Sequence, residues 1–296
     1  MDMEQEKKLI YYMQNREYGF LFHFFMFTIS ALRHCKGERP IIYIPYMRPT
    51  LKEVDANAIR SLGFGDHELN TTRGFPPDYN WDNCKINYEI CELLKDKYQF
   101  IYTLEELPSY ESYTIVKSGG EENDVWGDSF QFLKSLFEDI VGKAPLNPNK
   151  YIYITRKGSE IISLHGGKKV RCILNEDELL NAIQPLGFQC VQLETLSFID
   201  KIRLFQSAKI VVAPNTAALM FCLFSTTNSH IVELIPRYIV GQFKTHWKQT
   251  QYQEMCEMMN ISYTRFQSYT YVEDYLNGTI DIPSLVLFLQ SIVNST

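Results

Sequence analysis

The chain has 296 residues, of which 45% are hydrophobic and 22% are charged, and its formal net charge is −6. These values are those of a globular protein long enough for two domains, and the acidic balance argues against an extended nucleic-acid-binding surface. The most apolar run, residues 19–32, is shorter than a membrane span, and no apolar signal-like segment follows the charged N-terminus. We therefore predict a cytoplasmic protein with no membrane span and no nucleic-acid partner.

The first half of the chain alternates short apolar runs with longer segments of helical spacing. Strands are predicted at residues 9–13, 41–44 and 100–103, and helices at residues 22–33, 51–62 and 130–141. Gly142 to Lys150 then combines glycine, two prolines and two asparagines, which is typical of a linker. We predict a first α/β domain over residues 1–146.

The second half repeats a strand–helix rhythm more regularly. Strands are predicted at residues 151–156, 190–193, 209–213 and 230–235, and helices at residues 176–186, 198–207 and 217–224. This alternation predicts a parallel sheet with right-handed crossovers. Residues 209–213 are apolar without alternation, which is typical of a strand buried on both faces.

Local signals place the ends of the helices in this half. Asn175 is the predicted N-cap of residues 176–186, with Glu178 completing a capping box, and Gly187 is the predicted stop. Ser197 is the predicted N-cap of the next helix. The fold class that follows is α/β, with a second domain over residues 147–296 whose last helix, about residues 283–294, could pack back on the first domain.

Ligands of open parallel sheets bind beyond the carboxyl ends of the strands, so the loops after the strands matter most. Asn215, Thr216 and Ala217 follow one predicted strand and open a helix, where backbone N–H groups suit a diphosphate. An ordinary N-cap by Asn215 or Thr216 is the alternative. Glu233 lies in an apolar strand and needs a partner, either a ribose diol or a structural arginine or backbone group.

Basic side chains after another strand are weaker indications of a phosphate site, and the common nucleotide and metal motifs are missing. Lys157, Lys168, Lys169 and Arg171 follow the first strand of the second half, where they could neutralise phosphates or form a solvated loop. No glycine-rich dinucleotide or triphosphate motif follows a strand, and neither a D-x-D triplet nor a C-x-x-C pair occurs. We predict no metal site.

One histidine in the first half stands out because aromatic residues flank it. His23 opens a predicted helix after a polar loop, in the run Phe22-His23-Phe24-Phe25. A neutral imidazole there could accept a proton from an acceptor hydroxyl. A histidine satisfied within the core is the alternative.

The second half resembles glycosyltransferase family 61. The resemblance is carried by residues 153–156, 171–179, 186–188, 193–198, 202–205, 211–214, 217–219 and 232–234. It implies two Rossmann-like domains facing a cleft, the GT-B architecture. It also implies inverting transfer of xylose, N-acetylglucosamine or arabinose from a UDP-sugar to a hydroxyl of a glycan or glycoprotein. The UDP-sugar is a co-substrate, and neither a metal nor another cofactor is implied.

Residue by residue, the resemblance places a donor-binding set in the second half: Arg156, Arg171, Asn175, Glu176, Glu194, Asn215, Thr216, Ala217 and Glu233. Asn215 to Ala217 would meet the diphosphate, and Glu233 would lie near the nucleoside. His23 is the predicted catalytic base, with Asp82 and Asp128 as the next candidates.

The chain departs from the family at its most recognisable turn, where Asn215-Thr216 stands in place of His-Gly. This departure motivates a second hypothesis, a non-catalytic protein that binds a nucleotide sugar or glycan on the same scaffold. A third hypothesis, another Rossmann enzyme such as a methyltransferase or dehydrogenase, is disfavoured by the missing glycine-rich fingerprint.

Overall fold

A computed structural model describes the protein over residues 8–11, 40–43, 89–101, 114–117, 126–157, 173–236, 251–271 and 278–295. The chain divides into two compact units, Met1–Ile140 and Val141–Thr296. The predicted boundary after residue 146 lies in the loop that leads into the second unit. Within the described ranges, every helix is too short or too polar to cross a bilayer.

The described strands of the first unit form one parallel sheet. They are β1 (Lys8–Tyr11), β2 (Ile41–Tyr43), β3 (Gln99–Ile101) and β4 (Thr114–Lys117), in the order β3-β2-β1-β4. The first three confirm predicted strands, whereas β4 was not predicted. The predicted helices at residues 22–33 and 51–62 lie outside the described residues.

Helix α5 (Trp126–Val141) ends the first unit and begins earlier than the predicted residue 130. Phe130, Leu133 and Phe137 recur at helical spacing and are fully buried, which confirms an amphipathic helix. At its far end, Asp139 accepts a hydrogen bond from Lys97 Nζ at 3.2 Å, across an exposed ion pair.

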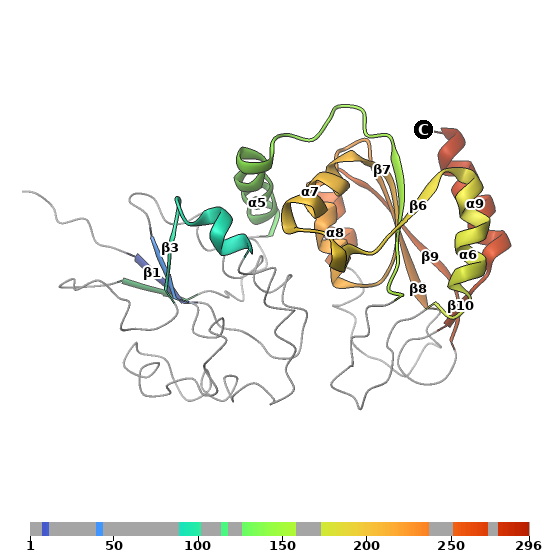
Figure 1. Ribbon diagram of the computed structural model, residues 1–296, viewed down its shortest axis with the longest axis horizontal. Coiled ribbons are helices and arrows are strands. Elements are labelled where there is room, and N and C mark those ends of the chain that lie inside the picture. Colours follow the sequence, from blue (N-terminus) through green and yellow to red (C-terminus); the bar gives the residue numbers. More distant parts are fainter. Residues whose placement is uncertain are drawn as a thin grey trace, which may run out of the picture. The chain divides into compact units, whose positions relative to one another are not determined.

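The second unit is built on a larger sheet (Figure 1). Its strands are β5 (Lys150–Ile154), β6 (Phe188–Val191), β7 (Ala208–Pro214), β8 (His230–Pro236), β9 (Ser262–Tyr271) and β10 (Gly278–Ile280). Their order is β10-β9-β8-β7-β5-β6, and all neighbours are parallel except β10 and β9. The predicted parallel sheet is therefore confirmed, and β9 and β10 extend it beyond the predicted strands.

Helices cover both faces of this sheet (Figure 1). One face carries α6 (Glu176–Ile183) and α9 (Ile282–Ser295), whose apolar residues form a core cluster with alternate residues of the strands. The other face carries α7 (Phe198–Ser207), the 3₁₀ helix η8 (Ala217–Phe224) and α8 (Gln251–Met258), which contact β7, each other and β9.

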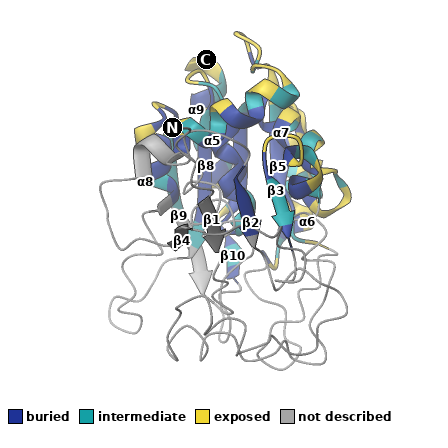
Figure 2. Ribbon diagram, turned by 90° about the vertical axis from the view of Figure 1, so that its left-hand side faces the viewer, coloured by how far each residue is buried: buried dark blue, intermediate teal, exposed yellow. Residues whose placement is uncertain are grey.

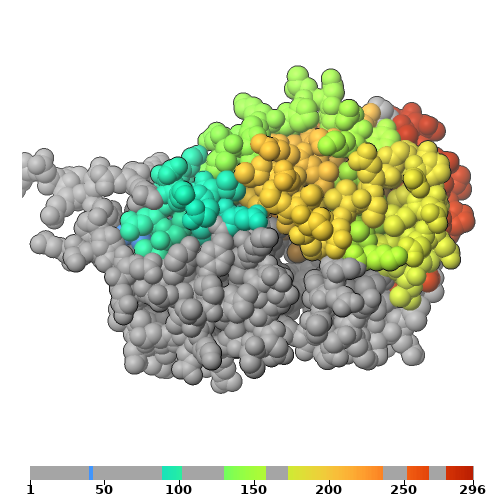
Figure 3. Space-filling view, in the orientation of Figure 1, coloured from blue at the N-terminus to red at the C-terminus, as the bar shows by residue number. Residues whose placement is uncertain are grey.

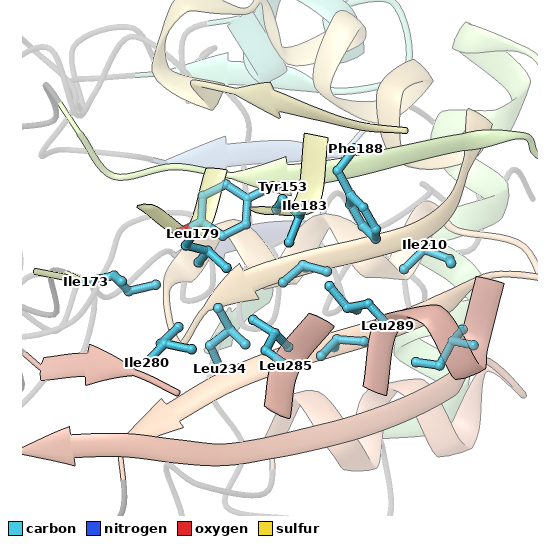
Figure 4. Close-up of a cluster of buried hydrophobic side chains, with 13 residues drawn as sticks. Tyr153, Ile173, Leu179, Ile183, Phe188, Ile210, Leu234, Ile280, Leu285 and Leu289 are labelled. Atoms are coloured by element: carbon cyan, nitrogen blue, oxygen red, sulfur yellow. The ribbon is translucent and has the colours of Figure 1, made fainter. Parts of the chain in front are cut away.

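Figure 4 shows the first of these cores, with Leu285 and Leu289 of α9 lying against Leu179, Ile183 and the strands. The buried face of the last helix is thus taken up within the second unit itself. Figure 2 shows buried residues concentrated in the central strands. Ile210 to Ala213 of β7 are all fully buried, which confirms the strand predicted to be covered on both faces.

The predicted helix ends have mixed outcomes. Ser197 caps α7 by accepting a hydrogen bond from the Asp200 N–H at 3.1 Å, as predicted. Gly187 ends the short 3₁₀ helix η6 (Gln184–Leu186) after α6 with a left-handed φ of 91°, as predicted. The capping box at Asn175 is wrong, because this side chain makes no cap hydrogen bond and pairs with β10 instead.

Loop residues 142–149 separate α5 from β5 and belong to the stretch coloured green at the molecular surface in Figure 3. Leu146 within this loop is 87% exposed. The loop is nevertheless fixed at both ends, because Gln206 Nε2 donates to the Gly142 carbonyl at 2.8 Å and the Asn149 N–H donates to the Ser207 carbonyl at 3.2 Å.

Candidate functional site

The order of strands defines one position in the second unit where a ligand site is expected. The chain leaves β5 for β6 on one side and returns to β7 on the other, so the direction of the crossovers reverses between β5 and β7. In open α/β sheets, ligands bind at such a switch point, beyond the carboxyl ends of the strands. Tyr153 is paired with Val212, so the loops that follow β5 and β7 emerge beside each other.

The loop after β7 is a tight turn into η8. Thr216 has an extended backbone, and its Oγ1 accepts from the Ala218 N–H at 3.3 Å while its carbonyl accepts from the Leu219 N–H at 3.1 Å. Thr216 is therefore the N-cap of η8. The Asn215 N–H donates to the Leu234 carbonyl at 3.2 Å, which fastens the turn to β8.

A buried carboxylate lies beside this turn. Glu233 of β8 is 0% exposed, and its neighbours in register are Ala213 on β7 and Arg265 on β9. Asn215 Nδ2 donates to one carboxylate oxygen and Tyr263 Oη donates to the other, while Arg265 Nε lies 3.5 Å from the second oxygen. The partner that Glu233 requires is thus supplied by protein side chains, including the structural arginine that was one of the two alternatives.

Burial and hydrogen bonding have opposite effects on this carboxylate. Removal from water raises the pKa of Glu233, and the hydrogen bonds from Tyr263 and Asn215 and the charge of Arg265 reduce that rise. Burial and the neighbouring carboxylate together raise the pKa of Tyr263 well above its usual value. The phenol therefore stays protonated and remains a hydrogen-bond donor to Glu233.

Arg265 and Tyr263 were not found from the sequence, because no strand was predicted over residues 262–271. The run Tyr263-Thr264-Arg265-Phe266 does carry the β-branched and aromatic residues typical of a strand. Its pairing with β8, however, could not be inferred from the run itself. Two guanidinium nitrogens of Arg265, Nε and Nη2, are buried and have no hydrogen-bond partner among the described residues.

A second polar cluster lies where β5 ends. Glu176, the first residue of α6, is buried, and its Oε1 accepts from Tyr153 Oη at 2.7 Å and from Thr155 Oγ1 at 2.9 Å. The Lys157 N–H in turn donates to Thr155 Oγ1 at 2.9 Å. These bonds fix the path of the chain as it leaves β5.

The side chain of Lys157 makes an exposed ion pair with Asp177, with Nζ 2.6 Å from Oδ1. The hydrogen bond to Asp177 and the negative charge of that carboxylate raise the pKa of Lys157. Asn175, just before α6, exchanges hydrogen bonds with the backbone of Ile280. The side chains of Asn175 and Glu176 are therefore both engaged in holding α6 to the sheet.

The remaining predicted residues are dispersed. Arg156 is half-buried and follows β5 at the switch point, whereas Glu194 is exposed in the 3₁₀ turn η7 (Leu193–Thr195) after β6. Asp128 lies in the first turn of α5, in the first unit. His23, Asp82 and Arg171 lie outside the described residues. The structure thus brings Asn215, Thr216, Ala217 and Glu233 together, and the contacts of Asn175 and Glu176 belong to a separate cluster.

Comparison with known proteins gives one family match. The family described as "Glycosyltransferase 61" matches residues 21–232, which covers most of both units. The match includes the β7–η8 turn and ends one residue before Glu233. No curated protein matches the chain.

Proposed function

The chain belongs to glycosyltransferase family 61, and on that premise we propose that it transfers a sugar from a UDP-sugar to a hydroxyl of a glycan or glycoprotein. The transferred sugar is xylose, N-acetylglucosamine or arabinose, so the activity is that of a hexosyl- or pentosyltransferase. The reaction inverts the anomeric carbon and requires no bound metal. The two units correspond to the two Rossmann-like domains of the GT-B architecture, with the donor on the second.

The observation that carries this proposal is the β7–η8 turn at the switch point of the second sheet. Asn215 holds the turn through Glu233 and through the Leu234 carbonyl, and Thr216 caps the helix that follows. A turn fixed in this way presents a preorganised surface to a diphosphate, and preorganisation lowers the cost of stabilising charge in the transition state. Arg156, after the neighbouring strand, adds a positive charge at the same edge of the sheet.

The reaction we propose is a single displacement. The acceptor hydroxyl oxygen attacks the anomeric carbon, the bond from that carbon to the diphosphate oxygen breaks, and UDP leaves with the electron pair. The hydroxyl proton passes to a base, for which His23 is the first candidate and Asp82 and Asp128 are the next. The turn at Asn215–Ala217 and the charge of Arg156 stabilise the departing diphosphate.

Binding and turnover separate this proposal from its rivals. Purified protein is incubated with UDP-xylose, UDP-N-acetylglucosamine and UDP-arabinose, and thermal stabilisation and UDP release are measured with and without glycan acceptors. We expect stabilisation by at least one UDP-sugar, together with UDP release. Stabilisation without turnover across the panel would support the non-catalytic alternative, and stabilisation by S-adenosylmethionine or NAD but not by UDP would contradict donor binding.

The base is tested on the same assay with the variant His23→Gln. Loss of a general base lowers the rate by about 10²–10⁴-fold. We expect that loss in UDP release with unchanged stabilisation by the donor. The matched control is His230→Gln, in the strand β8, which we expect to retain turnover. Full turnover in His23→Gln would show that His23 is not the catalytic base, and Asp82 and Asp128 would then be the candidates.

A further inference from the structure

We propose that Arg265 binds the diphosphate of the nucleotide donor, and that Glu233 holds its guanidinium in place for this purpose. The proposal rests on the proposed function, because it takes the β7–η8 turn as the donor site. Arg265 lies beyond the residues that match the family, which end at residue 232.

The first argument is the state of the guanidinium. An arginine carries five N–H donors and is always charged. The guanidinium of Arg265 is close enough to Glu233 and Tyr263 to limit the rise in the pKa of both groups. Its buried Nε and Nη2 nevertheless have no acceptor at full hydrogen-bond geometry among the described residues, and only a fifth of the side chain is exposed. The nearest charge, Glu233 Oε2, lies 3.5 Å from Nε, which is long for a charge-assisted hydrogen bond. Buried donors without acceptors are rare in folded proteins, so an acceptor from beyond the described residues is expected, and we infer that a ligand supplies it.

The second argument is position. Asn215 Nδ2 donates to one carboxylate oxygen of Glu233, and Arg265 Nε lies 3.5 Å from the other. The guanidinium therefore lies within a few ångströms of the residue that opens the β7–η8 turn. Because strands β7, β8 and β9 are consecutive neighbours in the sheet, Ala213, Glu233 and Arg265 share one row across it. Arg265 thus belongs to the same face and level of the sheet as the turn.

The third argument is what the turn itself can offer an anion. The N–H groups of Ala218 and Leu219 are already bonded to Thr216. Fewer unpaired backbone N–H groups therefore remain at the start of η8 than its small residues would lead one to expect. A diphosphate at this turn needs additional positive charge, and the planar fork of an arginine matches phosphate oxygens in two parallel hydrogen bonds. Lys157 is less suited to this role, since its ammonium is held by Asp177.

Glu233 then acts as a positioning residue. Its two carboxylate oxygens accept hydrogen bonds, one from Asn215 Nδ2 and the other from Tyr263 Oη. These two bonds fix the orientation of the carboxylate beside Arg265. A hydroxyl of the ribose or sugar would also satisfy a buried N–H group, but a single hydroxyl oxygen cannot match the planar fork of the guanidinium, whereas two phosphate oxygens can accept from it in parallel. The chemistry therefore favours phosphate, and the two sources can be told apart by comparing UDP with uridine.

The test measures the dissociation constants of UDP and uridine for the full chain, using Arg265→Lys and Arg265→Gln. A lost charge-assisted phosphate contact corresponds to about 10- to 100-fold in affinity. We expect Arg265→Gln to weaken UDP binding by this factor and uridine binding by less than about twofold, with Arg265→Lys in between because it keeps the charge but not the fork. The matched control is Arg203→Gln on α7, an exposed arginine paired loosely with Asp200 at 3.9 Å, which should leave both constants unchanged.

Removing Arg265 alone leaves a buried carboxylate without its counter-charge, which can prevent folding. The double variant Glu233→Gln/Arg265→Gln removes both charges together, and we expect it to fold and to show the same selective loss for UDP. Wild-type affinity for UDP in folded Arg265 variants would overturn this inference while leaving the proposed function intact. If the wild-type chain bound no nucleoside diphosphate, both the inference and the proposed function would be wrong. Equal losses for UDP and uridine would overturn the assignment to phosphate.

Discussion

Asn175 and the backbone of Ile280 exchange two hydrogen bonds, from Asn175 Nδ2 to the Ile280 carbonyl and from the Ile280 N–H to Asn175 Oδ1, each 2.9 Å long. The neighbouring Leu174 N–H also donates to the Gly278 carbonyl at 2.8 Å. An asparagine side chain thus behaves as an extra strand residue beside β10. It joins the start of α6 to the edge of the sheet, across a large separation in sequence.

This pairing predicts that Asn175→Ala destabilises the second unit. Each hydrogen bond contributes about 0.5–1.5 kcal/mol, so a loss of about 1–3 kcal/mol in unfolding free energy is expected. Urea denaturation followed by circular dichroism measures it. The control is Asn181→Ala on the exposed side of α6, where alanine should be neutral or slightly stabilising. Equal effects of the two substitutions would contradict a specific role for Asn175.

The bond from Tyr153 to Glu176 predicts a stability loss in Tyr153→Phe. This change deletes the hydroxyl that donates to Glu176 Oε1 at 2.7 Å but keeps the buried ring. Loss of a donor to a buried carboxylate should lower the unfolding free energy by about 1–3 kcal/mol. Tyr151→Phe, on the same strand and face, is the control, because its ring packs on Phe188 and remains in the variant. A denaturation midpoint unchanged in Tyr153→Phe would show that the bond does not contribute.

His230 predicts a pH dependence of stability. Burial lowers the pKa of His230 below its usual 6.5, and Nε2 is hydrogen-bonded to Thr264 Oγ1 at 2.9 Å. The unfolded chain therefore takes up a proton at a higher pH than the folded chain does. Stability from this residue is present above pH 6.5 and is lost as the pH falls from 6.5 toward the lowered pKa.

The measurement is the unfolding free energy of wild type and His230→Gln between about pH 5 and pH 8. The unfolding free energy of the wild type should fall relative to that of His230→Gln as the pH falls, since glutamine does not titrate. A difference independent of pH over this range would contradict the lowered pKa.

The packing of η8 predicts a large effect of Phe221→Ala. Phe221 is buried against Phe205, with ring centroids 5.7 Å apart, and also contacts Phe198 and Phe224. Removing such a ring costs about 3–5 kcal/mol through lost burial and the cavity left behind. The variant should also weaken UDP binding, because η8 carries the turn at Asn215–Ala217.

The control for this variant is Leu287→Ala on α9, where the side chain is 67% exposed. We expect a change of less than about 0.5 kcal/mol there. Thermal unfolding with and without UDP measures both effects. A Phe221→Ala protein as stable as Leu287→Ala would show that the aromatic cluster does not fix η8.

The sequence by itself determined the local elements of the second unit. The apolar run at Ile210–Ala213 indicated a doubly buried strand, Ser197 indicated a cap, and Gly187 indicated a helix end. These features depend on side-chain periodicity and on contacts within a few residues, and both can be read along the chain. The same reasoning identified Glu233 as a buried carboxylate in need of a partner.

Only the tertiary structure decided which partners these residues have. The local pattern predicted that Asn175 caps α6, but β10 lies close enough for its backbone to bind the Asn175 amide instead. Two of the partners of Glu233, Tyr263 and Arg265, come from β9, a strand that was not predicted. They reach it only because β8 and β9 pair with Glu233 opposite Arg265. Strand order and register depend on contacts between distant segments, so the chemistry at the β7–η8 turn became visible only once the sheet was assembled.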